Sequence, residues 1–280
     1  MEKVGLVLGG GGARGLAHIG AIRGLEEGGF RPDAIAACSI GGIVGALMAA
    51  GHGWRHILKL ASAFPGDYFG IGGKGGLLST KGMEKTLRDE LPARFEDLEI
   101  PMQVTAVDVQ AGELVILEKG PLLPALRASS ALPGVLTPTK LGDRYLVDGG
   151  LLNNVPVDLI RAMTDSPVVA VDVSVPPDIP LALDDADTWW RTLAHRIQEG
   201  QPFLTLEIFL KGFVIPQAAL TRARLRDHPP DLLIRPDLSR KIRMQDFHRC
   251  DEAMEAGYRA SKEALEGWDA GRSRPPSPVT

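Results

Sequence analysis

The stretch 34–42 constrains the fold of this chain most strongly, because a short apolar run ends abruptly there in a serine followed by glycines. Residues 34–38 are apolar and residues 43–50 are small or apolar, so the order predicts a buried strand, a sharp turn and a helix. A serine at such a turn adopts a strained backbone conformation that exposes its hydroxyl group. Ser39 is therefore a candidate nucleophile, and the alternative is that the small residues here serve only close packing.

A run of glycines at 9–12 gives a second constraint. It follows a short apolar strand predicted at 3–8 and precedes apolar residues spaced by three, from Leu16 to Leu25, that indicate a helix. Without Cβ atoms, successive glycines can turn their backbone N–H groups toward an anion, and the start of the next helix adds partial positive charge. The run predicts an anion-binding loop, with a tight strand-to-helix turn as the alternative.

Residues 10–15 also fit the pattern G-x-G-x-x-G, which is typical of dinucleotide-binding proteins. Such a site needs an acidic residue at the end of the second strand, where it binds the ribose. The second strand ends instead in Cys38-Ser39, and the nearest acid, Asp33, precedes that strand. A dinucleotide-binding oxidoreductase is therefore the weaker interpretation of these glycines.

A third motif lies far downstream, where a short apolar strand predicted at 144–148 ends in an aspartate followed by two glycines. A glycine turn lets the carboxylate of Asp148 approach another loop closely. Asp-Gly-Gly is also an ordinary turn sequence, so the motif by itself does not indicate catalysis. Together with Ser39, however, Asp148 becomes a candidate general base.

These three motifs together resemble the patatin-like phospholipase family, in particular its bacterial members and the neuropathy target esterase branch. The family's glycine-rich motif G-G-G-x-[RK]-G corresponds to residues 10–15, its G-x-S-x-G serine to Ser39 and its D-G-[GA] aspartate to Asp148. The resemblance covers roughly residues 4–173, with a weaker similarity at 231–265. Ala37 stands where the family usually has glycine, which bears on the geometry of the turn and not on the nucleophile.

The resemblance implies a three-layer α/β/α fold with a largely parallel central sheet. It also implies a serine-dependent hydrolase of lipid acyl esters, in which Ser39 attacks the ester and Asp148 accepts its proton. Arg14 would brace the glycine loop, and backbone N–H groups would bind the oxyanion; the expected donors are Gly10, Gly11, Gly12 and Ile40. No metal or cofactor is implied, and the expected substrates are phospholipids, lysophospholipids or neutral acyl esters. The alternative is a catalytically inactive relative with a binding or regulatory role, which the intact motifs disfavour.

Composition fits one soluble domain, which we expect to span residues 1–268 with a disordered tail at 269–280. The chain of 280 residues contains 44% hydrophobic and 24% charged residues, and its net charge of -4 argues against a nucleic-acid partner. Cys38 and Cys250 lack metal or redox spacing, and we expect Cys38 to be a buried core thiol. No signal peptide and no apolar window of about 18 residues are visible. We therefore expect a cytoplasmic protein, with contact at the inner face of the membrane left open.

Alternating strands and helices are predicted along the rest of the chain. Residues 52–78 read as an irregular loop, either a flap beside the site or a plain surface loop. Residues 203–214 are strongly apolar, and with a helix predicted at 187–199 they either complete the core or form an exposed mouth for acyl chains or a bilayer. Asp108 reads as a polar edge position, or as an acid at a strand end near the site. Further strands are expected at 101–109, 113–117, 167–173 and 231–235, and helices at 80–91, 122–130, 156–163 and 245–268.

The order of the histidines leaves a Ser-His-Asp triad as an alternative to a Ser-Asp dyad, because three histidines follow Asp148. None of the three has a predicted supporting loop, so we expect a dyad. His18 should support the glycine loop, whereas His52 and His56 have no evident partner. The three downstream histidines are His195, His228 and His248.

Overall fold

The computed structural model describes residues 1–63, 70–71, 78–79, 81–177, 203–238, 242–244 and 246–272. The helix predicted at 187–199, which includes His195, lies outside these residues, and so do positions 273–280 of the predicted tail. The loop predicted at 52–78 lies outside them in part.

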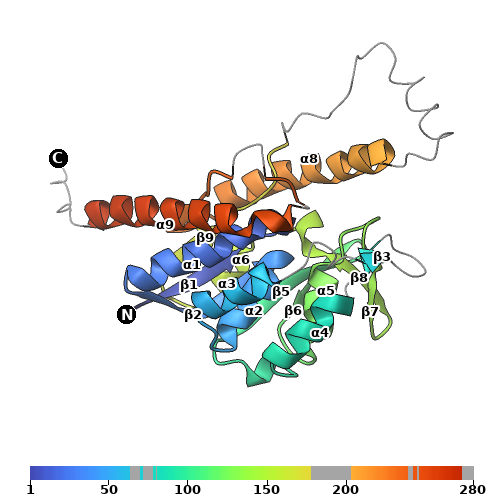
Figure 1. The fold of residues 1–280 in the computed structure, drawn as a ribbon, viewed down its shortest axis with the longest axis horizontal. Helices are drawn as coiled ribbons and strands as arrows, with labels where there is room; N and C mark the ends of the chain where they lie inside the picture. The colour runs from blue at the N-terminus through green and yellow to red at the C-terminus, as the bar shows by residue number, and fades with distance from the viewer. Residues whose placement is uncertain are drawn as a thin grey trace, which may run out of the picture.

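A mixed sheet forms the centre of the fold, with the strand order β10-β9-β1-β2-β5-β8-β7 and with β6 also paired to β5 (Figure 1). The apolar runs recognised in the sequence become its parallel part, as expected for strands buried on both faces. The remaining strands pair antiparallel at one side of the sheet. The parallel strands are β1 (Glu2–Leu8), β2 (Phe30–Cys38), β5 (Met102–Asp108), β9 (Val168–Val171) and β10 (Leu232–Ile234); the antiparallel strands are β6 (Glu113–Leu117), β7 (Thr139–Leu141) and β8 (Arg144–Asp148).

Helices cover both faces of this sheet. Alternate residues of each strand face opposite sides, so Leu6 and Leu8 join one apolar core whereas Val7 joins the other. The first core lies under α1 (Ala17–Glu27), α2 (Ile40–Ala49), α3 (Trp54–Ser62), α4 (Lys81–Glu90), α5 (Leu122–Ser129) and α9 (Cys250–Arg272); the second lies under α6 (Val157–Ile160) and α8 (Phe203–Asp227). The arrangement is the expected α/β/α fold.

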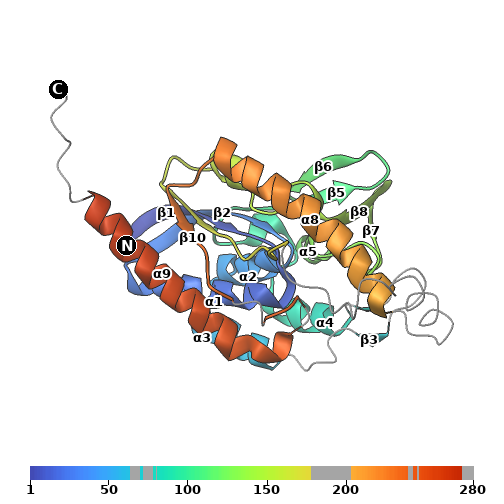
Figure 2. The same ribbon diagram turned by 90° about the horizontal axis from the view of Figure 1, so that it is seen from above.

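Small residues allow α9 to lie directly along α1, as Figure 2 shows. A Cβ atom at Gly20 of α1 would overlap the carbonyl oxygen of Met254, and one at Gly257 of α9 would overlap that of Ala17. The two backbones therefore approach more closely than side chains would permit. This contact fixes the carboxyl-terminal helix to the helix that follows the glycine loop.

One predicted loop and the bounds of the final helix differ in the structure, and the length of α8 was not predicted. Residues 54–62 of the predicted loop form helix α3, with Ile57 and Ala61 buried at helical spacing. The apolar residues 203–214 belong to the 25-residue helix α8, in which Phe213 and Val214 are buried while Ile215 is 51% exposed. The final helix begins at Cys250 rather than at residue 245, and it continues to Arg272. Strand β7 was not predicted, nor was the small pair β3 (Gly70–Ile71) and β4 (Leu78–Ser79).

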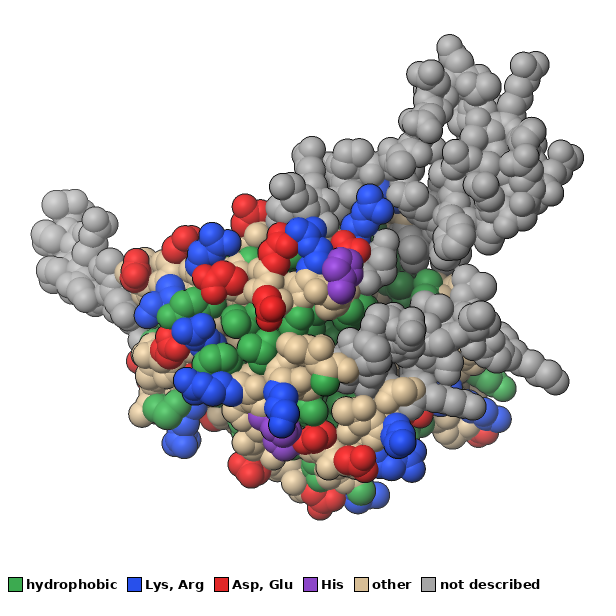
Figure 3. All heavy atoms as spheres, in the orientation of Figure 1, with side chains coloured by type: hydrophobic (Ala, Val, Ile, Leu, Met, Phe, Trp, Pro, Cys, Tyr) green, Lys and Arg blue, Asp and Glu red, His purple; other side chains and the backbone are tan. Residues whose placement is uncertain are grey.

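Acidic and basic side chains are interspersed over the described part of the face shown in Figure 3. Apolar side chains lie between them, and several gather near the middle of this face. In the part of the chain that the structure describes, no helix has both the length and the apolar character needed to cross a bilayer.

Candidate active site

Ser39 occupies a strained turn between β2 and α2. Its backbone angles are φ 54° and ψ -128°, and it is the only non-glycine residue with positive φ in the described part of the chain. A Cβ atom at Gly41 would overlap the carbonyl oxygen of Leu8 and lie 2.8 Å from that of Gly9, which explains the glycine two positions later. The Ser39 N–H donates to Ser129 Oγ at 2.9 Å, so α5 also anchors the turn.

The register of the sheet brings Ser39 and Asp148 together. Cys38 pairs with Thr105 of β5 in the parallel ladder, and the next β5 residue, Ala106, pairs with Asp148 of β8. The hydroxyl of Ser39 donates to Asp148 Oδ2 at 2.6 Å, a distance typical of a strong bond to a carboxylate. Two of the three sequence motifs thus meet in one hydrogen bond.

The other carboxylate oxygen of Asp148 is also held in place. Asp148 Oδ1 accepts the N–H of Gly150 at 2.8 Å and the thiol of Cys38 at 3.5 Å. Burial raises the pKa of Asp148, and these hydrogen bonds oppose the rise. Cys38 is buried as expected, and burial together with the nearby carboxylate raises the pKa of its thiol, so it acts as a donor.

Histidines take no part in this hydrogen-bonded pair within the described residues, where no imidazole bonds to Ser39 or Asp148. The ring of His18 is fully buried and donates from Nε2 to the carbonyl oxygen of Gly9 at 2.7 Å, so it supports the glycine loop. Burial lowers the pKa of His18 to about 4, which keeps the ring neutral at neutral pH.

The N–H groups of the glycine loop fall into two sets. Gly9 donates to Val171 O at 3.1 Å, Gly10 to Asn154 O at 3.2 Å and Ala13 to Met244 O at 2.7 Å. The N–H groups of Gly11 and Gly12 have no acceptor among the described residues, and the same holds for Ile40 at the start of α2. Because the Gly10 N–H is already bound, it is a poorer candidate than expected, and Gly11, Gly12 and Ile40 remain as candidate donors to an anion.

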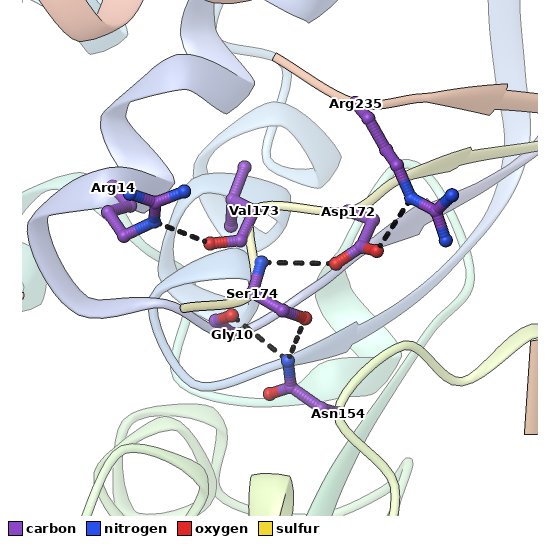
Figure 4. A network of polar contacts seen from close by, with 7 residues as sticks. All are labelled: Gly10, Arg14, Asn154, Asp172, Val173, Ser174 and Arg235. Atoms are coloured by element: carbon purple, nitrogen blue, oxygen red, sulfur yellow. Dashed lines mark hydrogen bonds and ion pairs between the residues drawn. The ribbon is translucent and has the colours of Figure 1, made fainter. Parts of the chain in front are cut away.

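Arg14 packs under this loop, where it is 4% exposed. Its Nε donates to Val173 O at 3.1 Å and its Nη1 to Ile242 O at 3.1 Å, and the first contact is drawn in Figure 4. Burial lowers the pKa of the guanidinium group. These contacts tie the loop to the segment after β9 and to the segment before α9, as a bracing side chain would.

Sequence reasoning missed two supporting residues, Ser129 and Asn154. Ser129 lies at the end of α5, in the stretch that precedes β7 and β8, and only the fold brings it to Ser39. Asn154 lies six residues after Asp148, and its amide nitrogen donates to Gly10 O at 3.1 Å. Both residues lie within the range that resembles the family, and this resemblance was the one feature of the sequence that could have pointed to them.

One group in the described chain could hold a metal ion: His52, His56 and Glu90, whose ligand atoms lie within 4.8 Å of one another. His52 donates to the carbonyl oxygen of Glu90 at 2.8 Å, and His56 donates to its carboxylate at 2.8 Å. The expectation that these histidines lack a partner was therefore wrong. Each of these three side chains takes part in a hydrogen bond. His52 and His56 come after the carboxyl end of α2, whereas Ser39 precedes its amino end.

Asp108 is likewise satisfied away from the site. Its carboxylate accepts the N–H of Gln110 at 3.0 Å and that of Ala111 at 3.4 Å, so it caps the turn between β5 and β6. The alternative that Asp108 is an acid of the site has no support in these contacts.

Comparisons with known proteins give several relatives. A curated protein named as an uncharacterized NTE family protein, from Mycobacterium bovis, is 33% identical over 284 residues, covering 95% of this chain and 47% of that protein. A second NTE family protein, from Mycobacterium tuberculosis, is 29% identical over 342 residues and covers 95% and 92% of the two chains. Lysophospholipase NTE1 of Mycosarcoma maydis is 31% identical, covering 96% of this chain and 15% of that protein. The chain thus spans about half of the first relative and a small part of the last.

Among solved structures, VipD from Legionella pneumophila matches with a TM-score of 0.49 and 14% identity, covering 95% of this chain and 67% of that chain. A sequence model described as patatin-like phospholipase matches residues 6–160. That range is more than half of the chain, and it contains the glycine loop, Ser39 and Asp148. The chain therefore belongs to the patatin-like phospholipase family.

Proposed function

We propose that this chain is a serine-dependent lipid acyl hydrolase in which Ser39 and Asp148 form a catalytic dyad. The single observation that carries the proposal is the 2.6 Å hydrogen bond from Ser39 Oγ to Asp148 Oδ2 at a strained turn. A serine hydroxyl becomes a competent nucleophile when a base within hydrogen-bond reach takes its proton. Asp148 is the acceptor that meets this requirement.

In the first half of the reaction, Ser39 Oγ attacks the acyl carbonyl carbon and its proton passes to Asp148 Oδ2. The carbonyl oxygen becomes an oxyanion, which accepts hydrogen bonds from the N–H groups of Gly11 and Gly12, with Ile40 as a further donor. The intermediate then collapses, and the leaving alcohol takes the proton from Asp148. The product of this half is an acyl ester on Ser39.

In the second half, water attacks the acyl ester of Ser39 and gives its proton to Asp148. The same N–H groups stabilise the second oxyanion, and the proton returns to Ser39 Oγ as the free acid leaves. The positive end of the α2 dipole, which begins at Ile40, adds to this stabilisation. Every step is served by groups of the chain, so the mechanism calls for no cofactor.

The burial of Asp148 fits the role of a base. Burial raises the pKa of its carboxyl group, and a base of higher pKa takes the serine proton more readily. The carboxylate must still be ionised to act. The acidic limb of the pH–rate profile should therefore follow a carboxyl group whose pKa lies above the ordinary aspartate value.

Lysophospholipids are the first substrates to test, because one relative is named a lysophospholipase. Phospholipids and neutral acyl esters stay in the proposal as further members of the class. The dinucleotide interpretation is disfavoured further. Asp33 lies inside β2 rather than before it as expected, away from the carboxyl end of that strand, and it accepts hydrogen bonds from Thr164 and Ser166. The inactive alternative is disfavoured by the intact pair of Ser39 and Asp148.

The test is release of free fatty acid from a lysophospholipid, a diacyl phospholipid and a p-nitrophenyl acyl ester. Wild type is compared with Ser39→Ala and with Ser62→Ala, a control serine exposed on α3. We expect hydrolysis of at least one substrate by wild type and by the control, and none above background by Ser39→Ala. Activity that survives in folded Ser39→Ala, or no hydrolysis of any acyl ester by wild type, would refute the proposal.

A further inference from the structure

Asn154 binds both polar groups of Gly10. Its backbone C=O accepts the Gly10 N–H at 3.2 Å, and its side-chain Nδ2 donates to the Gly10 carbonyl oxygen at 3.1 Å. Asn154 is 1% exposed, so these bonds form away from competing water. Figure 4 shows the side chain pointing from its own loop to the glycine loop. One residue therefore clamps the glycine next to the proposed oxyanion donors.

The orientation of the Asn154 amide is fixed by two further residues. Nδ2 also donates to Ser174 Oγ at 2.9 Å, while Oδ1 accepts from Gln217 Nε2 of α8 at 3.3 Å. A flipped amide would place two N–H donors face to face at Gln217 and would leave Gly10 O without a donor. Ser174 is itself held, because its N–H donates to Asp172 Oδ1 at 3.0 Å and Asp172 pairs with Arg235 at 3.1 Å (Figure 4).

The clamp determines the direction of the next N–H group. In a trans peptide the C=O of one residue and the N–H of the next point in opposite directions. Because the Gly10 carbonyl oxygen faces Asn154, the Gly11 N–H faces away from Asn154. This N–H has no acceptor among the described residues. The clamped glycine lies beside the nucleophile, since a Cβ atom on Gly10 would be 3.1 Å from Ser39 Cβ.

We infer that Asn154 is a positioning residue for hydrolysis: by holding the Gly10–Gly11 peptide, it aims the Gly11 N–H at the oxyanion formed on Ser39. The inference rests on the proposed function and deepens it. Asn154 touches no reacting atom, so its effect passes through the peptide. Replacing Asn154 should therefore raise the free energy of the transition state, in which charge develops on the substrate oxygen, and should change substrate binding only weakly.

Asn154→Asp is the sharpest perturbation, because it keeps the shape and removes the donor. A carboxylate oxygen would then face Gly10 O and Ser174 Oγ, and the peptide would rotate away from an acceptor that repels it. Loss of one oxyanion donor lowers turnover by roughly 10²–10³-fold, so a misaimed donor should lower kcat by roughly 10- to 100-fold. KM should stay within about threefold of wild type, because the substitution removes no contact to the bound substrate in its ground state.

A separate readout distinguishes positioning from mere structural support. A trifluoromethyl ketone with the acyl chain of the best substrate adds Ser39 Oγ to its carbonyl carbon, the proton moves to Asp148, and the carbonyl oxygen becomes an alkoxide. Its affinity should fall in Asn154→Asp by about the same factor as kcat/KM, because both depend on the oxyanion donors. Affinity for the matching secondary alcohol, in which CH(OH) replaces the ketone carbonyl and no oxyanion can form, should change by less than about threefold. Gln110→Glu, on the exposed turn after β5, is the control for an amide-to-carboxylate change and should match wild type.

The inference fails if folded Asn154→Asp keeps wild-type kcat and ketone affinity, or if affinity for the ketone and for the matching alcohol falls together. If Asn154→Asp does not fold, Gln217→Ala decides, because it removes the bond that orients the amide and leaves Asn154 itself unchanged. It should show the same pattern at roughly 3- to 10-fold, the scale of about one hydrogen bond, and wild-type behaviour would overturn the inference. Failure of the proposed function would look different: Ser39→Ala would then remain active, whatever Asn154→Asp does.

Discussion

Replacing Asp148 by asparagine should abolish most of the activity without disturbing the site, and the contacts show why. The two bonds to Oδ1, from the Gly150 N–H and the Cys38 thiol, come from donors. Only the amide oxygen of the asparagine can accept these two bonds, so it takes the position of Oδ1. The NH₂ group must then occupy the position of Oδ2, where it donates to Ser39 Oγ and cannot accept its proton.

The size of the effect follows from the loss of general-base catalysis. Such catalysis contributes roughly 10²–10⁴-fold, which corresponds to roughly 3–5 kcal/mol of activation free energy. The Gly11 and Gly12 donors remain, so we expect kcat to fall by this factor and KM to change little. The fold should persist: burial raises the pKa of Asp148, so its contribution to stability is present below the unfolded pKa and is lost as pH rises through the folded pKa. The amide of Asp148→Asn has no such proton to lose, so the variant does not lose stability in this way as the pH rises.

Steady-state hydrolysis of a p-nitrophenyl ester, with circular dichroism and thermal unfolding on the same samples, measures the prediction. The matched control is Asp108→Asn, which changes a buried strand-end acid that caps the β5–β6 turn. It should keep kcat within about threefold of wild type, because no proton transfer involves it. A folded Asp148→Asn protein with kcat within about tenfold of wild type would refute Asp148 as the general base.

Three further predictions concern the turn, the glycine loop and the histidines. Gly41→Ala should lower the unfolding free energy by roughly 1–3 kcal/mol and lower kcat, because the new methyl overlaps the Leu8 carbonyl group; unchanged urea unfolding and turnover would contradict this. The folded-state pKa of His18 is about 4, below its ordinary 6.5, so the stability that its neutral ring contributes is present above pH 6.5 and is lost as the pH falls toward 4. In urea titrations, the unfolding free energy of wild type relative to His18→Gln should therefore fall by roughly 2 kcal/mol between pH 7.5 and pH 5. The same pH dependence in both proteins would contradict the burial argument. Alanine at any other histidine should leave kcat within about tenfold, and one such variant as inactive as Ser39→Ala, with its fold intact, would replace the dyad by a triad.

The sequence predicted the parts of the site that depend on local backbone geometry. Glycine spacing and short apolar runs specify a strand followed by a sharp turn, so Ser39, Asp148 and the glycine loop could be recognised one by one. Their meeting in space followed from the family resemblance, and the register of β2, β5 and β8 gives its physical cause. Ala37 is fully buried beside Leu8 in that register, so the turn accommodates alanine where glycine is usual.

Contacts between distant segments could not be predicted in this way. Asn154 reaches Gly10 across 144 positions, and His56 meets Glu90 across 34. Neither contact leaves a periodic or compositional trace. The length of helix α8 was not predicted, because Gly212 and Pro216 lie inside it and both normally indicate a helix end. Burial of Leu225 in the second core, and of Phe213 and Val214 in a separate cluster with Val175, outweighs that preference.

Covalent trapping of Ser39 tests the central claim most directly. A fluorophosphonate probe is incubated with folded wild type, and the modified peptide is mapped by mass spectrometry beside Ser39→Ala and Asp148→Asn. We expect a single phosphonyl group on Ser39, none in Ser39→Ala, and labelling of Asp148→Asn slowed by roughly 10²-fold or more, because the base no longer takes the serine proton. A wild-type protein that hydrolyses acyl esters while its label maps to another residue, or while Ser39 stays unmodified, would contradict the account.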